Sequence, residues 1–558
     1  MSVSRIGRSK FFPLVASVLV ALAMAGCDGD DGAAGAAGAA GAAGADGADG
    51  ADGINCWDLN ANGAGDIATE DLNGDGVVDV NDCSGVASGA YAAEKLHQGY
   101  FTDNAYEGTQ SCLVCHGLIG EDVLTTAHFK WQGTADGLTG FEGLELGKNQ
   151  IINNFCIAVP SNEGRCTQCH AGYGYADNTF AFNDPETIDC LVCHDQTGTY
   201  AKAKKTAGLP ETEPPVDLNV VARSVAEDGG AGHGVPTISN CIDCHAKAGG
   251  GDNVKHGDLA MVLQTGVTRD DDVHMGTDGE DEDCTFCHRL DANHGIGGMV
   301  YHSTDEGVMD DCGDCHGTTE GRHAGTSVEQ LFNVRPEHLK LACQVCHIPT
   351  FARVTSTKTE WYWEFAGLDE SPVPTPDPVT GRPAWDKMKG TFKWENNVRP
   401  SLLYYDGKWD KALIGLNDNY DDLGGVLAKP SATYETEGAM IYPFKRMIGN
   451  QPVDNNGTIL VPHLFGMKGG DNPFWGAYDW DLALADGAAY AGQTFSGEGG
   501  WSFRDTVMYL AVNHEVAPKE MALGYDSDCG DCHFEGKYDW TLLGWTDDPL
   551  LGGVRGPQ

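Results

Sequence analysis

Positive charge is scarce in this chain. Its 558 residues include 35 lysines and arginines against 82 aspartates and glutamates, which gives a formal net charge of −47. So acidic a surface repels phosphate over long distances. We therefore expect no nucleic acid partner, and no binding of anionic lipid through the bulk surface.

Long hydrophobic runs are also lacking. Hydrophobic residues make up 41% of the chain and the mean hydropathy is −0.30, which argues against a polytopic membrane protein. The apolar stretch of residues 11–26 is too short for a comfortable span and follows a basic segment. Residues 1–26 are therefore predicted to be a bacterial lipoprotein signal peptide, because the Met24–Cys27 ending is similar to a lipobox. An ordinary signal peptide beside a stray cysteine is the alternative to a lipid anchor on Cys27.

Residues 27–55 place glycine at every third position, from Gly29 to Gly53. Strict Gly-x-y triplets suit a collagen triple helix. Alanine and aspartate fill the other positions, however, and this segment has no proline. We expect a collagen-like tether, either a flexible spacer or a trimeric stalk.

Residues 56–83 contain two acidic units thirteen residues apart. The second has oxygen ligands at positions 1, 3, 5, 9 and 12 and glycine at position 6, which matches an EF-hand-type Ca²⁺ loop. A solvated acidic linker is the alternative. Cys56 and Cys83 bracket the units and could close a disulfide. The predicted Ca²⁺ ligands are Asp71, Asn73, Asp75, Asp79 and Asp82.

The strongest pattern is C-x-x-C-H, which occurs eight times. Chance predicts roughly 0.02 such motifs at these cysteine and histidine frequencies. Two thiols add to the vinyl groups of one haem, and the adjacent histidine then lies under the iron as the proximal ligand. A zinc site would give the histidines no role. The sequence predicts eight c-type haems (Fe), held by Cys112, Cys115 and His116; Cys166, Cys169 and His170; Cys190, Cys193 and His194; Cys241, Cys244 and His245; Cys284, Cys287 and His288; Cys312, Cys315 and His316; Cys343, Cys346 and His347; and Cys529, Cys532 and His533.

The expected fold is mainly α with extensive coil, and eight covalent haems rather than a sheet organise its core. Helical periodicity is weak, and 76 glycines and 23 prolines favour many turns. Seven motifs lie between Cys112 and His347, close enough for electron transfer, whereas residues 348–528 carry none. We expect the aromatic residues of that stretch to pack in the core and against haems. The five prolines of residues 366–383 predict a surface loop.

Axial ligands can be counted from the histidines. Eight irons need sixteen axial ligands, and the motifs supply eight. Eleven other histidines are present, which permits a set of bis-histidine haems or one iron left open or held by another group. The motifs also take 16 of the 20 cysteines, so Cys156 is left over beside Cys27, Cys56 and Cys83.

Several longer stretches are shared with a known family. They are IINNFCIAVPSNEGRCTQCHAGYGY (151–175), IDCLVCHDQTGTY (188–200), GGGDNVKHGDL (249–259), ACQVCHIPTFAR (342–353), IYPFK (441–445), VPHLFG (461–466) and HEVAPKE (514–520). With these stretches, the haem count and the motif order, residues 95–548 resemble the octahaem tetrathionate reductase family of c-type cytochromes.

The resemblance implies a respiratory reductase in which a lysine replaces the distal histidine of the catalytic haem. Lys255 matches that lysine, Asp252 an aspartate three residues earlier, and Cys156 a lone cysteine near them. The catalytic haem would be the second, with His170 as its proximal ligand. For Cys156 the alternatives are an inert buried thiol or a disulfide with Cys56 or Cys83, and for Lys255 a surface lysine. The remaining distal ligands, chosen with the help of the resemblance, are His128, His256, His274, His294, His338, His463 and His514, with His323 in reserve.

The reaction implied by the resemblance is reduction of tetrathionate to thiosulfate, with nitrite and hydroxylamine as further substrates. Because tetrathionate is a dianion, a chain of charge −47 would need a local positive pocket to bind it. The expected partners are this small anionic substrate, an electron-donor cytochrome or quinol-linked protein, and a membrane reached through the lipid anchor. The expected location is the bacterial envelope, periplasmic or at the cell surface.

Two other functions compete with the reductase. The lipid site, the tether and the surplus of histidines also fit a non-catalytic surface cytochrome that passes electrons to an external acceptor or a partner cytochrome. A calcium-dependent adhesin that carries haem would depend on residues 29–83 alone.

Overall fold

The computed structural model describes residues 78, 90–226, 234–263, 266–291, 293–297, 308–465, 473–534 and 536–556. The predicted signal peptide, tether and Ca²⁺ ligands lie outside the described residues, as do Cys27, Cys56 and Cys83. In the part of the chain that is described, no helix is both long and apolar enough to cross a membrane.

Short helices dominate the chain as far as residue 347, and most of them carry a C-x-x-C-H motif. The spacing i, i+3, i+4 brings both cysteines and the histidine to one face of a single helical turn. The helices that follow one another here are α2 (Ala90–Asp103), α3 (Gln110–Val123), α4 (Ala127–Lys130), α5 (Glu163–Cys166), α6 (Leu191–His194), α7 (Leu218–Ser224), α8 (Ile238–His245), α9 (Cys284–Cys287), α10 (Cys312–His316), α11 (Thr319–His323), α12 (Glu329–Val334) and α13 (Cys343–His347).

Short 3-10 turns and two small hairpins connect these helices. The hairpins pair β1 (Gln132–Thr134) with β2 (Glu145–Gly147), and β3 (His288–Arg289) with β4 (Val308–Met309). The 3-10 turns among the described residues are η2 (Thr167–Cys169), η3 (Pro185–Thr187), η4 (Ala260–Leu263), η5 (Pro336–Lys340), η6 (Trp363–Phe365), η7 (Lys519–Met521), η8 (Cys529–Asp531) and η9 (Trp540–Leu543).

The stretch without motifs forms an eight-stranded mixed sheet, so the expectation of a mainly α fold without an organising sheet is wrong there. The strand order is β6-β7-β5-β11-β12-β10-β9, and β8 pairs with β11. Two short helices, α14 (Phe474–Ala477) and α15 (Trp480–Tyr490), lie between its last two strands in sequence. The strands are β5 (Thr357–Tyr362), β6 (Trp385–Asp386), β7 (Gly390–Glu395), β8 (Ser401–Tyr405), β9 (Trp409–Lys411), β10 (Val426–Pro430), β11 (Met440–Asp454) and β12 (Trp501–Ala511).

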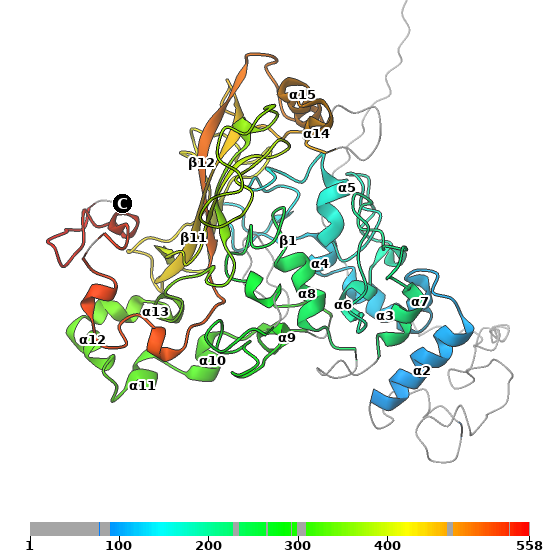
Figure 1. Cartoon of the computed structure of the whole chain (residues 1–558), viewed down its shortest axis with the longest axis horizontal. Helices are drawn as coiled ribbons and strands as arrows, with labels where there is room; N and C mark the ends of the chain where they lie inside the picture. Colours follow the sequence, from blue (N-terminus) through cyan, green and yellow to red (C-terminus); the bar gives the residue numbers. More distant parts are fainter. Residues whose placement is uncertain are drawn as a thin grey trace, which may run out of the picture. The chain divides into compact units, whose positions relative to one another are not determined.

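The long strands β11 and β12 form the centre of the sheet (Figure 1). They pair antiparallel from Phe444 opposite Ala511 to Asp454 opposite Trp501. β5 runs parallel to β11, and β10 runs parallel to β12. The strands are rich in aromatic and β-branched residues, which favour a pleated and partly buried surface. Weak helical periodicity in this stretch is therefore explained by strands.

Aromatic side chains of the sheet fill the core, as expected. Trp361 and Trp363 are fully buried and stack with their ring centroids 5.2 Å apart. The Nε1 of Trp363 donates a hydrogen bond to the Phe155 carbonyl at 2.8 Å, so the core of the sheet is tied to the segment before the second motif. Residues 366–383 form an irregular and mainly exposed loop, which confirms the prediction from their prolines.

Replacing Trp363 tests the importance of this packing. Trp363→Ala removes a fully buried indole and leaves the Phe155 carbonyl without its donor, so we expect a loss of about 3–5 kcal/mol in the free energy of unfolding. Denaturant titration followed by circular dichroism measures the loss. Val379→Ala is the matched control, because Val379 is 90% exposed; equal midpoints for the two variants would contradict the assigned core.

Candidate functional site

Motif histidines face a second histidine at a nearly constant distance. Two metal–nitrogen bonds of about 2.0 Å each separate the centroids of two axial imidazoles by about 6 Å. Among the described residues, seven such pairs have centroids 5.9 to 6.4 Å apart. They are His116 with His97, His245 with His128 and also with His256, His316 with His274, His347 with His323, His288 with His514, and His533 with His338.

The ring nitrogens of these histidines are oriented by further hydrogen bonds. A bond from Nδ1 fixes the tautomer and leaves Nε2 available to a metal, as is usual for metal-ligating histidines. These bonds join His194 to the Gly234 carbonyl (2.6 Å), His288 to Gly297 (2.8 Å), His323 to Thr319 (2.7 Å), His338 to Leu331 (3.0 Å), and His533 to the Asp548 carboxylate (2.8 Å). The residues present therefore fit multiple c-type haems.

The ring pairs can be compared with the predicted distal ligands. His128, His274, His338 and His514 each face a motif histidine, and His323 does so from the reserve. Sequence reasoning missed His97, which lies on α2 before the first motif and carries no local signal.

The remaining three predicted distal ligands are His256, His294 and His463. His256 lies 6.4 Å from His245, which His128 also faces. His294 has an electrostatic interaction with His194, and the other histidine that acts on His194 is His97. His463 bonds through Nδ1 to the carbonyl of Ser161 at 2.7 Å, and among the described residues its buried Nε2 has no hydrogen-bond partner, which suits a metal ligand.

The proximal histidine of the second motif is held differently from the others. His170 is buried among Phe129, Trp131, Tyr175, Phe180 and Phe182. Its Nε2 bonds to the Phe129 carbonyl, and burial lowers its pKa to about 3. The structure thus places His170 in an aromatic cage.

Cysteine thiols bring pairs of motifs into contact. The first motif contacts the third, the second the fourth, the fourth the fifth, and the sixth the seventh. Electrostatic interactions of Cys287 with Cys315 and of Cys346 with Cys532 join the fifth to the sixth and the seventh to the eighth. The thiol contacts are Cys112 with Cys190, Cys169 with Cys244, Cys241 with Cys284, and Cys312 with Cys343.

Cys156 is positioned by hydrogen bonds between its own segment and the sheet. The Asn154 amide donates to the carbonyls of Met447 (3.0 Å) and Thr506 (3.2 Å) on the two central strands. Its Oδ1 accepts from Gln451 Nε2 at 2.9 Å. Asn154 is buried, so the backbone two residues before Cys156 is fixed against β11 and β12.

Lys255 is positioned by a second set of contacts with the same sheet. The ammonium of Lys445 on β11 donates to the Val254 carbonyl (2.5 Å) and to Thr357 Oγ1 (2.6 Å). Thr357 Oγ1 in turn donates to the Asn253 carbonyl at 2.6 Å. Burial lowers the pKa of Lys255 to about 7, which favours the neutral amine that a metal would need.

A glycine turn lies between Cys156 and Lys255. A Cβ on Gly250 would lie 3.5 Å from the Cys156 sulfur, and a Cβ on Gly249 would lie 3.0 Å from the Cβ of Lys255. Both glycines have positive φ (82° and 99°), which other residues adopt at a cost. The structure thus brings the two predicted residues to opposite sides of one turn. Asp252 follows this turn, is exposed, and accepts a hydrogen bond from Arg382 Nη2 at its carbonyl (2.9 Å).

Three cations surround Cys156. Lys389, Lys358 and Arg165 all act on its thiol, although burial is the larger effect and raises the pKa of Cys156. In the part of the chain that the structure describes, none of the three forms a salt bridge with a carboxylate. We call Arg165, Lys358 and Lys389 the cation cluster; sequence reasoning expected positive charge here but did not find these residues.

Aromatic rings hold the cation cluster in place. The Nζ of Lys358 lies 3.8 Å from the Trp361 ring centroid and 3.3 Å from that of Phe392. Trp475 is shared by Arg165 (5.0 Å) and Lys389 (5.9 Å). Cation–π attraction compensates part of the lost hydration, and burial still lowers the pKa of Lys358 well below its usual value.

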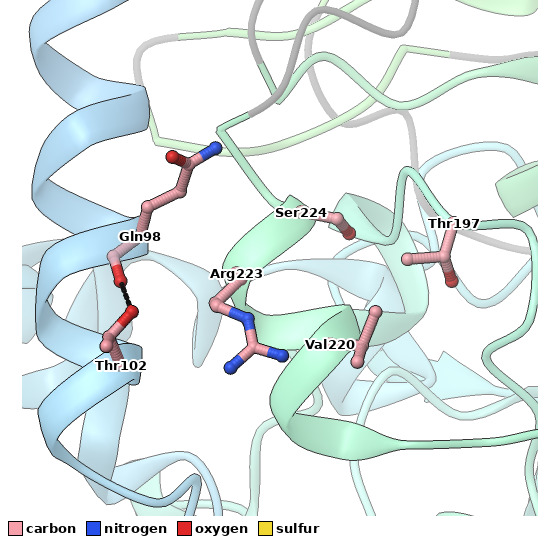
Figure 2. Close-up of a pocket in the computed structure, with 6 residues that line it drawn as sticks. All are labelled: Gln98, Thr102, Thr197, Val220, Arg223 and Ser224. Carbon is pink, nitrogen blue, oxygen red and sulfur yellow. Dashed lines mark hydrogen bonds between the residues drawn. The ribbon is translucent and has the colours of Figure 1, made fainter.

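A cavity lies elsewhere. It measures about 310 Å³ and is lined by Gln98, Thr102, Thr197, Val220, Arg223 and Ser224. Figure 2 shows Arg223 extending from α7 toward α2, where its Nη1 bonds to the Phe101 carbonyl at 3.3 Å. None of the residues near Cys156 or Lys255 lines this cavity, so we do not assign it a role in catalysis.

Comparisons with known proteins agree with this arrangement. The family model described as bacterial cytochrome c matches residues 358–536, which include the sheet. The crystal structure of octahaem cytochrome c from Shewanella oneidensis shares 33% sequence identity with this chain, covers 82% of this chain and 99% of that chain, and superposes with a TM-score of 0.69. An uncharacterized protein from Archaeoglobus fulgidus is 24% identical over 237 residues, which covers 34% of this chain and 76% of that protein.

Haem content distinguishes motif cysteines from Cys156. We expect eight haems per chain for the wild type and for Cys156→Ala, and seven for Cys529→Ala/Cys532→Ala, because thioether bonds need both motif thiols. Intact-protein mass spectrometry and the pyridine haemochrome assay measure the number. Loss of a haem in Cys156→Ala would contradict the assignment of Cys156 as the spare thiol.

Axial ligation can be tested at His97. His97→Ala removes the ring that faces His116, so we expect one low-spin ferric haem to become high-spin in the electron paramagnetic resonance (EPR) spectrum. Gln98→Ala is the comparison variant, because Gln98 is the next residue on α2 and has no imidazole, and it should leave the low-spin signals unchanged. Low-spin signals that stay unchanged in His97→Ala would contradict the pairing of His97 with His116.

Proposed function

This chain belongs to the octahaem cytochrome c family, and on that premise we propose that it is a respiratory reductase which splits tetrathionate beside Cys156 and Lys255. One observation carries the proposal: in a chain of net charge −47, three basic side chains that form no salt bridge among the described residues act on a single buried thiol. The resemblance of residues 95–548 to octahaem tetrathionate reductases supports tetrathionate as the substrate. Nitrite is a second anion that the same cations would attract.

The proposed reaction balances without protons. Tetrathionate, S₄O₆²⁻, takes up two electrons, its central S–S bond breaks, and each half gains one electron and leaves as thiosulfate, S₂O₃²⁻. The electrons come from a donor cytochrome or a quinol-linked protein. When bound, the haems would supply one-electron transfer along the motifs and the metal beside which the substrate is reduced.

Each residue of the site would have a role that depends on its charge. The cation cluster would bind the sulfonate groups and stabilise the negative charge that grows on sulfur as the bond breaks. Lys255, as a neutral amine, would hold the distal side of the second haem. Cys156 would lie against the substrate, and the exposed Asp252 would border the entrance.

Substrate binding and the protonation of Lys358 would be coupled. Burial disfavours the charged form of Lys358 in the free protein, whereas an anion beside it favours that form. A bound dianion should therefore draw a proton onto Lys358. Tetrathionate binding should strengthen as the pH falls, because more of Lys358 is then charged.

A non-catalytic conduit of electrons is the second candidate function. The thiol contacts between motifs favour it, since together with the electrostatic interaction of Cys193 with Cys241 they connect the first motif to the eighth regardless of any substrate. Reoxidation by substrate separates the two functions, because a conduit has no reason to react with tetrathionate. An external electron acceptor would reoxidise either protein.

We further propose a location outside the cytoplasmic membrane, where c-type haem is attached. The lipid site at Cys27 would anchor the chain to the envelope, and residues 27–55 would hold residues 95–548 away from the membrane. Residues 71–82 would bind Ca²⁺ next to this tether.

The reductase is tested by stopped-flow reoxidation of the fully reduced protein. We expect tetrathionate to reoxidise the wild type and to reoxidise Lys255→His at least about 100-fold more slowly, since a transition-state contact of this kind contributes 10²–10³ in rate. Reduced-minus-oxidised spectra follow the reaction. If the wild type stays reduced in tetrathionate, nitrite and hydroxylamine alike, the conduit is the better description.

The cation cluster has its own test. Lys358→Met should raise the KM for tetrathionate about tenfold or more, because it removes a charge-assisted contact of about 1.5–3 kcal/mol. The KM for hydroxylamine, which carries no negative charge, should change little. Lys408→Met is the matched control, since Lys408 is half exposed and pairs loosely with Glu142 at 3.9 Å. A tetrathionate KM that is equal in the two variants would refute binding by Lys358.

A further inference from the structure

One short segment reaches three motifs. Within residues 252–258, Lys255 interacts with Cys169 of the second motif. His256 lies 6.4 Å from His245 of the fourth motif. Asp258 contacts His514, whose ring lies 6.3 Å from His288 of the fifth motif.

Asp258 is a buried carboxylate with several donors on one oxygen. Its side chain is 2% exposed. Its Oδ2 accepts from the backbone N–H groups of Asn513 (2.8 Å) and His514 (3.0 Å), and Nδ1 of the His514 ring lies 3.3 Å away. Two of these groups are backbone N–H groups, which can only donate, and the third is a ring nitrogen that donates when it carries its proton. The Oδ2 of Asp258 is therefore the acceptor. The arrangement fixes both the backbone and the ring of His514.

A carboxylate on Nδ1 differs chemically from the usual backbone carbonyl. Four other histidines of the motif network, His194, His288, His323 and His338, bond to carbonyls. A full negative charge attracts the Nδ1 proton more strongly, which makes the opposite nitrogen a stronger donor to a metal. A stronger donor stabilises the ferric form over the ferrous form.

The position of Asp258 connects this effect to the candidate site. The fifth motif touches the fourth through Cys284 and Cys241, and the fourth touches the second through Cys244 and Cys169. Asp258 also lies three residues after Lys255, and Lys445, which holds the Val254 carbonyl, faces it electrostatically. Residues 252–258 therefore contain both Lys255, the proposed distal ligand of the second haem, and Asp258, which would set the donor strength of His514 at the fifth haem.

We propose that Asp258 is a positioning residue that orients His514 and lowers the reduction potential of the fifth haem, which would pass electrons toward the second. The effect belongs to the resting protein and needs no substrate. It can therefore be measured whether or not the chain reduces tetrathionate.

The test is a spectroelectrochemical titration of the full haem-loaded chain, monitored by optical and EPR spectroscopy. Asp258→Asn keeps the shape and an acceptor oxygen for the two backbone N–H groups but removes the charge. We expect one haem of eight to shift to more positive potential with a changed low-spin signal, while the other seven stay in place. Asp258→Glu should restore a potential close to that of the wild type, which a purely structural role would not require.

Two further measurements keep the proposal open to refutation. Asp548→Asn makes the same change at the His533 ring of the eighth motif and should move a different single haem in the same direction. If Asp258→Asn does not fold, His514→Ala identifies the affected haem by its lost low-spin signal, and wild-type data then give its potential. The proposal is overturned if that haem is among the most positive of the eight, or if Asp258→Asn titrates like the wild type.

Discussion

Hydrogen bonds from the two central strands to two distant loops are the constraint on which the rest of this structure depends. Asn154 binds the carbonyls of Met447 and Thr506, and Lys445 binds the carbonyl of Val254. These bonds are buried, where an unmade polar contact costs about 1–3 kcal/mol. The backbones that precede Cys156 and Lys255 are therefore fixed relative to one sheet. Without the sheet, Cys156 and Lys255, which are about a hundred positions apart in sequence, would not be held in fixed positions relative to each other.

Although the chain is acidic overall, several of its lysines lie in the interior. Lys358, Lys411 and Lys445 are almost fully buried, although lysine is among the residues least often found inside proteins. Each has partial compensation from aromatic rings or from backbone carbonyls. Burial disfavours the charged form of all three lysines, so an anion beside any of them would favour its protonation.

A site can be predicted from the sequence when the residues that form it are neighbours in the sequence. Haem attachment needs five consecutive residues, so all eight motifs are visible without a structure. Distal ligation joins residues far apart in sequence, so no local pattern marks His97 as the partner of His116. The sheet is hard to predict because β5 pairs with β11, some eighty residues later, and aromatic residues in strands look like residues that only pack a core. The cation cluster comes from three separate segments, so no local pattern marks Arg165 or Lys389.

The contacts of the loop of residues 252–258 explain why the residues around Lys255 are difficult to substitute one at a time. Its preceding glycines bring the backbone close to Cys156, because a Cβ on Gly250 would lie 3.5 Å from that sulfur. Its far end holds His514 through Asp258. A substitution that moved Lys255 would therefore also disturb the contacts of His514. In the proposed reductase, substrate chemistry and electron delivery would be coupled through this segment, and change would be easier in the cation cluster, whose residues belong to other segments.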